Sequence, residues 1–304
     1  MGAVPRVSVV VPTRGRPAWC LEAVESALAQ DGVEVEVVVS LDGDDPGLAA
    51  SLAARSDARV RVVVHPAAGR SAARNRGLRA ARHPLVALLD DDDRLLPGAL
   101  RARADALARH PQAVLVFGRA VATDAEGRET PSARRAASRG RETCEDFHRE
   151  QWLGRSLHPS TVTMRREVVE RLGGFDEDLP TGEDWVFFLR AADVGPFAFL
   201  PVPTVLYRRH PGQVRGDPAM QEAALPRWTA RYFDDPRTPP AADRHRRRLE
   251  GRHLNWIARN HRRRGDAASA RRCFTDAVAR DPSLLLHPRR LVRWLSLRLG
   301  PSRP

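Results

Sequence analysis

Runs of β-branched and other apolar residues alternate with helical patterns through the first half of the chain, and this alternation limits the folds open to it. The apolar runs predict five strands, at Arg6–Val11, Val33–Leu41, Val60–Val64, Leu85–Leu89 and Ala113–Val121. Helices are predicted between them, at Pro17–Gln30, Leu48–Ala54, Ser71–Pro84 and Gly98–His110. Because each helix can carry the chain back across a sheet, the order predicts an α/β fold with a doubly wound, mainly parallel sheet.

The second half of the chain departs from this alternation. A polar, Arg-rich stretch at about 123–151 predicts a long loop, which either has a binding function or is disordered. Further strands are predicted at Pro159–Met164, Phe197–Leu200 and Val205–Arg208, and further helices at Arg166–Leu172, Glu183–Ala192, Pro218–Tyr232, Arg244–Arg263, Ala267–Arg280 and Pro288–Leu299. We predict one domain over residues 1–214 and a small, Arg-rich helical annex over 215–304, in which Gly265-Asp266 marks the turn of a helical hairpin.

Every one of the 50 basic residues is arginine, and the net charge is +12. We attribute most of these arginines to a GC-rich coding sequence. The absence of lysine still excludes a P-loop lysine, a Schiff base and a lysine general base. The positive charge favours phosphates or anionic lipid as partners. Nucleic acid is the weakest candidate, because no nucleic-acid motif is present and only 6% of residues are aromatic.

The chain carries none of the features of a membrane-spanning or exported protein. No apolar run approaches the ~20 residues that cross a bilayer, and the first residues lack the apolar core of a signal peptide. We therefore predict a cytoplasmic protein. Cys20, Cys144 and Cys273 are far apart and odd in number, which predicts free thiols, with neither a disulfide framework nor a zinc site.

Four consecutive aspartates, Asp90–Asp93, follow the apolar run at Leu85–Leu89. Repulsion makes such a cluster costly unless a cation lies against it. The end of a parallel strand is where ligands bind in α/β sheets, so the cluster predicts a divalent metal with its phosphates. A calcium-binding EF-hand is excluded, because Leu95 and Arg101 stand where that loop needs Gly and Glu. A solvated acidic turn is the alternative.

Four other residues have both a functional and an ordinary interpretation. Asp42 ends the second strand and either binds a nucleobase or ribose or forms an Asx turn with Gly43. Arg74 lies in the first turn or two of a helix and either contacts a base or diphosphate or is solvated. Asp184 either takes a proton in catalysis or caps the helix that starts beside it. His210 is a metal ligand, a diphosphate contact or a surface residue.

Taken in order, these motifs resemble the family 2 glycosyltransferases, inverting enzymes of the GT-A (nucleotide-diphospho-sugar transferase) fold. The resemblance covers roughly Val7 to Val214. It rests on seven stretches, Val7–Arg14, Asp42-Gly43, Ala73-Arg74-Asn75, Leu89–Gly98, Gly173–Asp176, Gly182–Trp185 and Tyr207–His210. Two departures affect the base pocket: Leu41 stands where the family often has a second Asp, and Thr13-Arg14 replaces the usual Tyr-Asn.

The resemblance implies a role for each matched residue. Those that bind the donor are Pro12, Thr13, Arg14, Asp42, Arg74, Asp90 and Asp91. Asp92 and His210 are implied as ligands of a divalent metal, Mn²⁺ or Mg²⁺, and Asp184 as the catalytic base. The implied reaction moves a sugar from a nucleotide-diphosphate donor to the hydroxyl of a saccharide, lipid-linked or small-molecule acceptor. Inversion follows from one in-line displacement, in which a carboxylate takes the hydroxyl proton.

Two other functions compete with this one. A non-catalytic module that binds a nucleotide sugar or a partner would need neither the Asp cluster nor Asp184. A sugar-1-phosphate nucleotidyltransferase would carry a Gly-rich loop with Lys after the first strand, which this chain lacks. The segment Pro288–Leu299 mixes leucines with arginines, so it either docks on the core or contacts the inner face of the plasma membrane.

Overall fold

The structure is a computed structural model that describes residues 3–129, 141–146, 157–210 and 217–286. It contains two compact units, Met1–Glu177 with Phe187–His210, and Asp178–Val186 with Pro211–Pro304. Helix α8 (Glu183–Val194) contributes Glu183–Val186 to the second unit and its remaining residues to the first. The predicted domain boundary after Val214 and the predicted helix Pro288–Leu299 lie outside the described residues, as do 130–140 and 147–156 of the Arg-rich loop.

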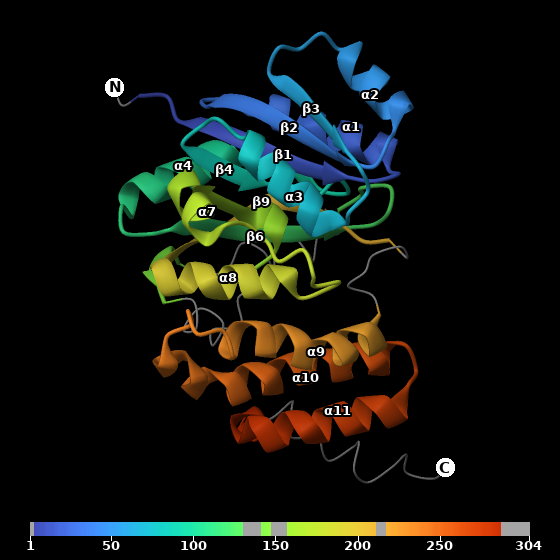
Figure 1. Ribbon diagram of the computed structural model, residues 1–304, viewed down its shortest axis with the longest axis vertical. Helices are drawn as coiled ribbons and strands as arrows, with labels where there is room; N and C mark the ends of the chain where they lie inside the picture. Colours follow the sequence, from blue (N-terminus) through green and yellow to red (C-terminus); the bar gives the residue numbers. More distant parts are fainter. Residues whose placement is uncertain (1–2, 130–140, 147–156, 211–216, 287–304) are drawn as a thin grey trace. The chain divides into compact units, whose positions relative to one another are not determined.

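The first unit contains one mixed sheet, which has nine strands within the described residues (Figure 1). The strand order is β3-β2-β1-β4-β8-β6-β9-β5, and β7 also pairs with β9. Its parallel half consists of β1 (Arg6–Thr13), β2 (Glu34–Asp42), β3 (Val60–His65) and β4 (Leu85–Leu88). The connecting helices are α1 (Pro17–Leu28), α2 (Pro46–Ala53) and α3 (Arg70–Ala80). This half confirms the predicted alternation of strands and helices.

The other half of the sheet is mostly antiparallel. β8 (Val162–Arg165) pairs antiparallel with β4 and β6 (Leu115–Thr123), whereas β6 and β9 (Phe197–Arg208) are parallel. The short strands β5 (Arg94–Leu95) and β7 (Thr143–Glu145) pair antiparallel with β9. Helices α4 (Ala99–Arg109) and α7 (Arg166–Leu172) complete this half. The sequence analysis placed β7 inside a loop, and that expectation is wrong for these three residues.

Two strand predictions are corrected where proline occurs. The expected strand at Pro159–Met164 begins instead with the 3₁₀ turn η1 (Pro159–Thr161), because Pro159 has no N–H to give to a ladder. The two short strands expected between Phe197 and Arg208 are one strand, β9. The pairing register of β9 against β6 shifts between Phe117 and Ala120. Pairing therefore continues past Pro201 and Pro203 of β9.

The sheet owes its stability to strands that are apolar on both faces. Val7, Val9, Val10 and Val11 of β1 have no exposed surface. Such runs are typical of parallel strands covered by helices on both sides. Burial of a valine or leucine side chain contributes about 1.5–3 kcal/mol. The buried strands therefore form a rigid sheet, and the ends of these strands hold polar side chains in fixed positions.

The second unit contains three long helices after the start of α8. They are α9 (Pro218–Phe233), α10 (Arg246–Arg263) and α11 (Ala267–Arg280), with 3₁₀ turns at η3 (Pro240–His245) and η4 (Pro282–Leu286). α10 packs against both α9 and α11 (Figure 1). Gly265 adopts a φ of 82° in the turn between α10 and α11, and Asp266 caps α11 by accepting the N–H of Ser269. The predicted helical hairpin is confirmed.

Candidate functional site

The acidic loop after β4 lies at the carboxyl ends of the parallel strands. β1 pairs with both β2 and β4, so the ends of these three strands meet at one edge of the sheet. Thr13 ends β1, Asp42 ends β2, and Asp90 follows β4 after Leu89. The structure therefore brings together side chains that are far apart in the sequence, as ligand sites in α/β sheets require.

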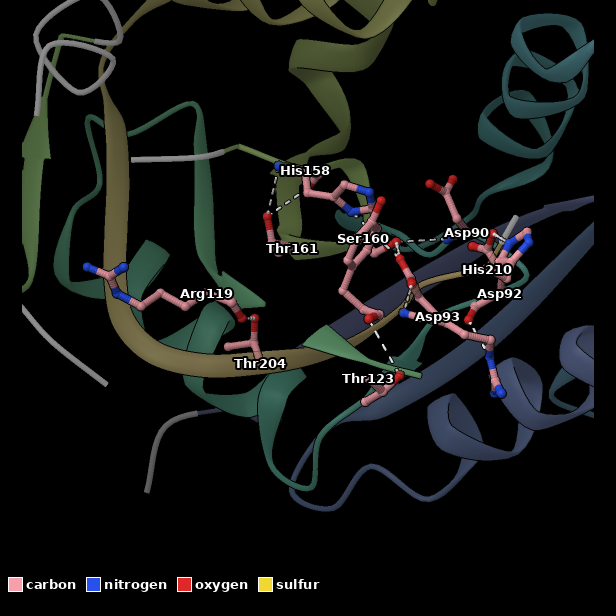
Figure 2. Close-up of polar contacts among 12 residues, drawn as sticks. Asp90, Asp92, Asp93, Arg119, Thr123, His158, Ser160, Thr161, Thr204 and His210 are labelled. Atoms are coloured by element: carbon pink, nitrogen blue, oxygen red, sulfur yellow. Dashed lines mark hydrogen bonds and ion pairs between the residues drawn. The ribbon is translucent and has the colours of Figure 1, made fainter. Parts of the chain in front are cut away.

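Asp93 anchors the loop from inside (Figure 2). Its carboxylate has no exposed surface and accepts hydrogen bonds from Ser160 Oγ (2.6 Å) and the Arg208 N–H (3.1 Å). The same Ser160 hydroxyl accepts the N–H of Asp90 at 3.0 Å. Burial, with Asp92 and Asp90 nearby, raises the pKa of Asp93 well above its usual range. Asp93 thus fixes the shape of the loop.

Asp91 lies under the end of β1. Its carboxylate accepts a hydrogen bond from Thr13 Oγ1 at 2.7 Å and lies 3.1 Å from the Arg16 guanidinium. Burial raises the pKa of Asp91 to about 6, against the opposing effects of Arg16 and Thr13. Burial, more than the neighbouring aspartates, is thus the reason that this carboxyl is a weaker acid than usual.

Asp92 is contacted by two residues from other elements. Its Oδ2 atom lies 2.6 Å from Arg16 Nη1 and 3.0 Å from His210 Nε2. His210 follows β9 and packs its ring 4.6 Å from that of Trp19 in α1. The two residues for which the resemblance implies a metal are therefore in direct contact in the structure.

A second group in this loop also has metal-ligand spacing. One ligand atom each from Asp90, Asp93 and His158 lie within 4.8 Å of one another. His158 precedes η1, and its Nδ1 lies 3.7 Å from Asp93 Oδ2 (Figure 2). The sequence analysis assigned no role to His158 or Ser160. Their partners lie 65 and more positions earlier in the chain, so no local motif marks either residue.

Arg74 supports the loop from α3. Its guanidinium is buried, donates to Asp90 Oδ1 at 2.8 Å, and lies 5.3 Å from the centre of the Phe175 ring. Burial disfavours ionisation of Asp90, but Arg74 and His158 outweigh it and lower the pKa of that carboxyl. The next residue, Asn75, exchanges two hydrogen bonds with the backbone of Phe175. Solvation, the ordinary interpretation of Arg74, is wrong.

Asp42 contacts the loop that leads into α3. Its carboxylate is 6% exposed and accepts the N–H groups of Ala68 (2.7 Å) and Gly69 (3.1 Å). The Asp42 side chain therefore bonds to this loop, and the predicted alternative of an Asx turn with Gly43 is wrong. Arg14 lies 3.7 Å away with 69% of its side chain exposed, while Pro12 is buried in β1 opposite Ser40. The carboxyl ends of β1 and β2 thus hold all four of these predicted donor-binding residues, Pro12, Thr13, Arg14 and Asp42.

Arg208 is a site residue that the sequence analysis left without a role. Its side chain is buried, its Nε donates to the Asp92 carbonyl at 3.0 Å, and Nη2 pairs with Glu22 of α1. Its guanidinium also lies 5.1 Å from the centre of the Trp19 ring. Arg208 therefore holds the backbone of the acidic loop against β9 and α1. Its place beside His210 in a matched motif is the only sequence signal that could have found it.

Asp184 belongs to the second unit. It is the second residue of α8, it is half-buried, and its Oδ1 accepts the Trp185 N–H at 2.9 Å. Gly182 precedes the helix with a φ of 85°. The Trp185 ring stacks on that of Trp228 in α9, with centroids 5.8 Å apart. Glu183, beside Asp184, is buried at 3% exposure.

No helix in the described part of the chain is long and apolar enough to cross a membrane.

Among curated proteins, the chain is 34% identical over 200 residues to the succinoglycan biosynthesis protein ExoO of Rhizobium meliloti. The aligned stretch covers 63% of this chain and 57% of that relative. It is 35% identical over 101 residues to the GalNAc(5)-diNAcBac-PP-undecaprenol beta-1,3-glucosyltransferase of Campylobacter jejuni, covering 32% of this chain and 33% of that protein.

The fold has solved counterparts. Residues 1–349 of S. aureus TarS, in complex with UDP-GlcNAc, match with a TM-score of 0.64 at 20% identity, over 95% of this chain and 83% of that one. This likeness confirms the predicted GT-A fold with its helical extension. The family model described as Glycosyl transferase family 2 matches residues 8–173, more than half of the chain. The chain therefore belongs to glycosyl transferase family 2 and is a glycosyltransferase.

Proposed function

We propose that this glycosyltransferase moves a sugar from a nucleotide-diphosphate donor to an acceptor hydroxyl with inversion, using a divalent metal. The observation that carries the proposal is the loop Asp90–Asp93 at the strand ends, where Asp91 and Asp92 share one cation, Arg16. Loops of this charge at this edge of an α/β sheet bind phosphates through a cation. Membership of the family supplies the class of reaction.

The donor atoms fit a divalent metal. Asp92 offers carboxylate oxygen and His210 offers imidazole nitrogen, 3.0 Å apart. Carboxylates suit Mg²⁺ and Mn²⁺. When bound, the metal would neutralise the charge of the departing diphosphate.

The residues at the strand ends would bind the nucleotide. We assign Pro12, Thr13, Arg14 and Asp42 to the nucleoside pocket, where Asp42 also positions the loop at Ala68 and Gly69. Arg14 is the most exposed of the four, and its guanidinium is able to reach a ligand. Arg74 holds Asp90, so it orients the part of the acidic loop assigned to donor binding.

Asp184 would be the catalytic base. A carboxylate that takes a proton from an attacking hydroxyl must be ionised at neutral pH and within hydrogen-bond reach of that hydroxyl. Its place at the start of a helix gives the carboxylate a fixed backbone position. A single in-line attack, with the proton passing to this carboxylate, leaves the sugar with inverted configuration and needs no nucleophilic carboxylate.

The relatives narrow the candidates for donor and acceptor. The structure of TarS with UDP-GlcNAc favours a uridine-diphosphate sugar as the first donor to test. The undecaprenol-linked substrate in the name of the C. jejuni relative favours a lipid-linked acceptor, alongside a saccharide or a small molecule. We expect a lipid-linked acceptor to bring the protein to a membrane surface.

Replacement of the proposed base tests catalysis. Asp184→Asn keeps the side-chain size but cannot accept a proton. We expect it to slow transfer by on the order of a hundredfold or more, with donor affinity and melting temperature near those of the wild type. Single-turnover rates, donor titration and thermal unfolding measure the three quantities. Glu183→Gln, beside it, is the matched control and should lose much less activity.

A helix cap at Asp184 gives the opposite pattern. In that case Asp184→Asn turns over normally, because Asn caps a helix about as well as Asp, and the base lies elsewhere. A binding module without catalysis would show no transfer and no slow hydrolysis of the donor by the wild type.

Replacement of the proposed ligand tests the metal. Asp92→Asn should weaken binding of a nucleoside diphosphate in Mn²⁺ at least tenfold and leave binding of the free nucleoside nearly unchanged, because only the diphosphate needs the metal. A chelator should reproduce this loss on the wild type. Titration calorimetry measures the affinity for the nucleoside diphosphate with and without chelator. If the two affinities are equal, the metal has no part in donor binding.

A further inference from the structure

The second unit contains a cluster of potential metal ligands that lies outside the acidic loop. One side chain comes from each long helix: Glu222 from α9, His261 from α10 and Cys273 from α11. A ligand atom from each of the three lies within 4.8 Å of the other two. Cys273 has no exposed surface, His261 is 5% exposed, and the Glu222 side chain is 29% exposed.

The histidine in this cluster is held in the way that metal-bound histidines are held. Its Nδ1 lies 3.2 Å from Asp266 Oδ2, and Asp266 is itself fixed as the N-cap of α11. The other ring nitrogen, Nε2, lies 3.4 Å from Glu222 Oε2 and makes no hydrogen bond to any described residue. A carboxylate on one nitrogen and a ligand position at the other is the usual arrangement of metal-binding histidine.

The glutamate is oriented as well. Arg272 Nη2 donates to both Glu222 oxygens, at 3.1 and 3.0 Å. This contact fixes the carboxylate beside the histidine and the cysteine. Two of the three ligand side chains are therefore positioned by neighbouring residues.

The donor set selects the kind of metal. A thiolate, an imidazole and a carboxylate together suit Zn²⁺, whereas Mg²⁺ and Mn²⁺ prefer oxygen. Three protein ligands leave the fourth tetrahedral position to water, since Glu222 is partly exposed. From the sequence no zinc site is expected, because the three cysteines are far apart and odd in number. That reasoning covers local spacing only, and here the ligands are 39 and 12 residues apart in the chain.

We propose that Glu222, His261 and Cys273 bind one Zn²⁺ ion, which ties α9, α10 and α11 together. The site is separate from the metal proposed for donor binding, and it does not depend on the proposed reaction. Its expected effect is on stability, because an ion that binds only the folded chain shifts unfolding to higher temperature.

Cobalt titration of the full-length protein tests this site, because Co²⁺ replaces Zn²⁺ and gives thiolate charge-transfer absorption only when a cysteine binds it. We expect this absorption to saturate at about one equivalent, to disappear on addition of Zn²⁺, and to be absent in Cys273→Ser. Cys20→Ser is the matched control, since Cys20 is also fully buried but belongs to the first unit, and should retain the absorption.

A second variant keeps the test decisive if Cys273→Ser fails to fold. Asp266→Asn preserves the helix cap, because Asn caps as well as Asp, but removes the carboxylate from His261. We expect it to weaken Co²⁺ binding on the order of tenfold, with the absorption spectrum unchanged in shape. Absence of charge-transfer absorption in the wild type, or its persistence in Cys273→Ser, shows a hydrogen-bonded cluster without metal and overturns the proposal.

Discussion

Four neighbouring aspartates have different environments, because each meets different partners. Asp93 is sealed inside by Ser160 and Arg208, and Asp90 is paired with Arg74. Asp91 and Asp92 share Arg16. The pKa values separate accordingly: that of Asp90 is lowered, whereas those of Asp91 and Asp93 are raised. The four aspartates of one loop thus differ in acidity because the residues that contact them differ, and the sequence of the loop itself does not show this.

The raised pKa of Asp91 makes stability depend on pH. Asp91 ionises with a pKa of about 6 in the folded chain and near 4 in the unfolded chain. Ionisation therefore favours unfolding: the cost is absent below pH 4, grows between pH 4 and 6, and is complete above pH 6. In metal-free protein we expect Asp91→Asn to exceed the wild type in stability by on the order of 2 kcal/mol at pH 8, and not at all near pH 4. Urea unfolding across this range measures the difference.

Asp57 is the control of opposite sign. Hydrogen bonds from Arg59 lower the pKa of this surface carboxyl to about 2, so its stabilising effect is present above pH 4 and lost as the pH falls through 2. Asp57→Asn should therefore lose a little stability at neutral pH, the effect being small because the pair is exposed to solvent. A gain for both variants at pH 8 would point to a general charge effect rather than to Asp91.

Elements position the site through close backbone contact as well as through side chains. Gly77 of α3 faces β1, and a Cβ atom there would overlap Val10 Cγ1. A helix normally gains stability when alanine replaces glycine. At Gly77 we expect alanine to lower stability instead, because α3 lies so close to β1. The same close packing places α3, and with it Arg74, beside the acidic loop.

Gly77→Ala is accordingly expected to destabilise the protein by about 1–3 kcal/mol despite the better helix former, because Val10 lies in a strand that cannot shift freely. Gly47→Ala in α2 is the matched control. The nearest atom to its added Cβ is Asp45 Oδ1 at 3.7 Å, so this change should be neutral or stabilising by up to about 1 kcal/mol. Denaturant midpoints for both variants give the comparison, and equal midpoints would exclude the close contact as a constraint.

The elements also show what sequence reasoning reaches. β1 to β4 and their helices are predictable within a few residues, since long apolar runs alternate with periodic ones. β9 is not, because its prolines suggest a break that a register shift absorbs. η1 is not, because the predicted strand runs through Pro159, which has no N–H to give to a ladder. In the site, Asp42 ends a strand, Asp92 follows one and Arg74 lies near the start of a helix, so the sequence singled out all three as candidates. Arg16, Ser160 and Arg208 were not given roles, because their significance depends on partners 67 or more positions away.

At the scale of the whole molecule, the strong positive charge favours anionic surfaces. The arginines and leucines at Pro288–Leu299 combine charge with apolar groups, which suits the interface of an anionic membrane. Docking of this segment on the rest of the chain is the alternative, and the two make different predictions for truncated protein.

We expect the full chain to float with vesicles that contain anionic lipid, and a chain ending at Leu286 to remain largely in the soluble fraction. Binding should weaken as salt rises from 0.01 to 1 M, because screening shortens the reach of the arginines from about 30 to 3 Å. Vesicles of neutral lipid are the control. Equal flotation of both chains would assign any membrane contact to another part of the protein.

The bond between the Asp93 carboxylate and the Arg208 N–H has a consequence for the order of folding. It joins positions 115 residues apart, the first after β4 and the second at the end of β9. During synthesis, the early strands and helices emerge long before that partner exists. The acidic loop therefore acquires its native shape only when the last strand joins the sheet, and closing so long a loop is a slow step. A nascent chain that stops short of β9 would hold much of the core of this fold, but its loop would lack the partner that shapes it.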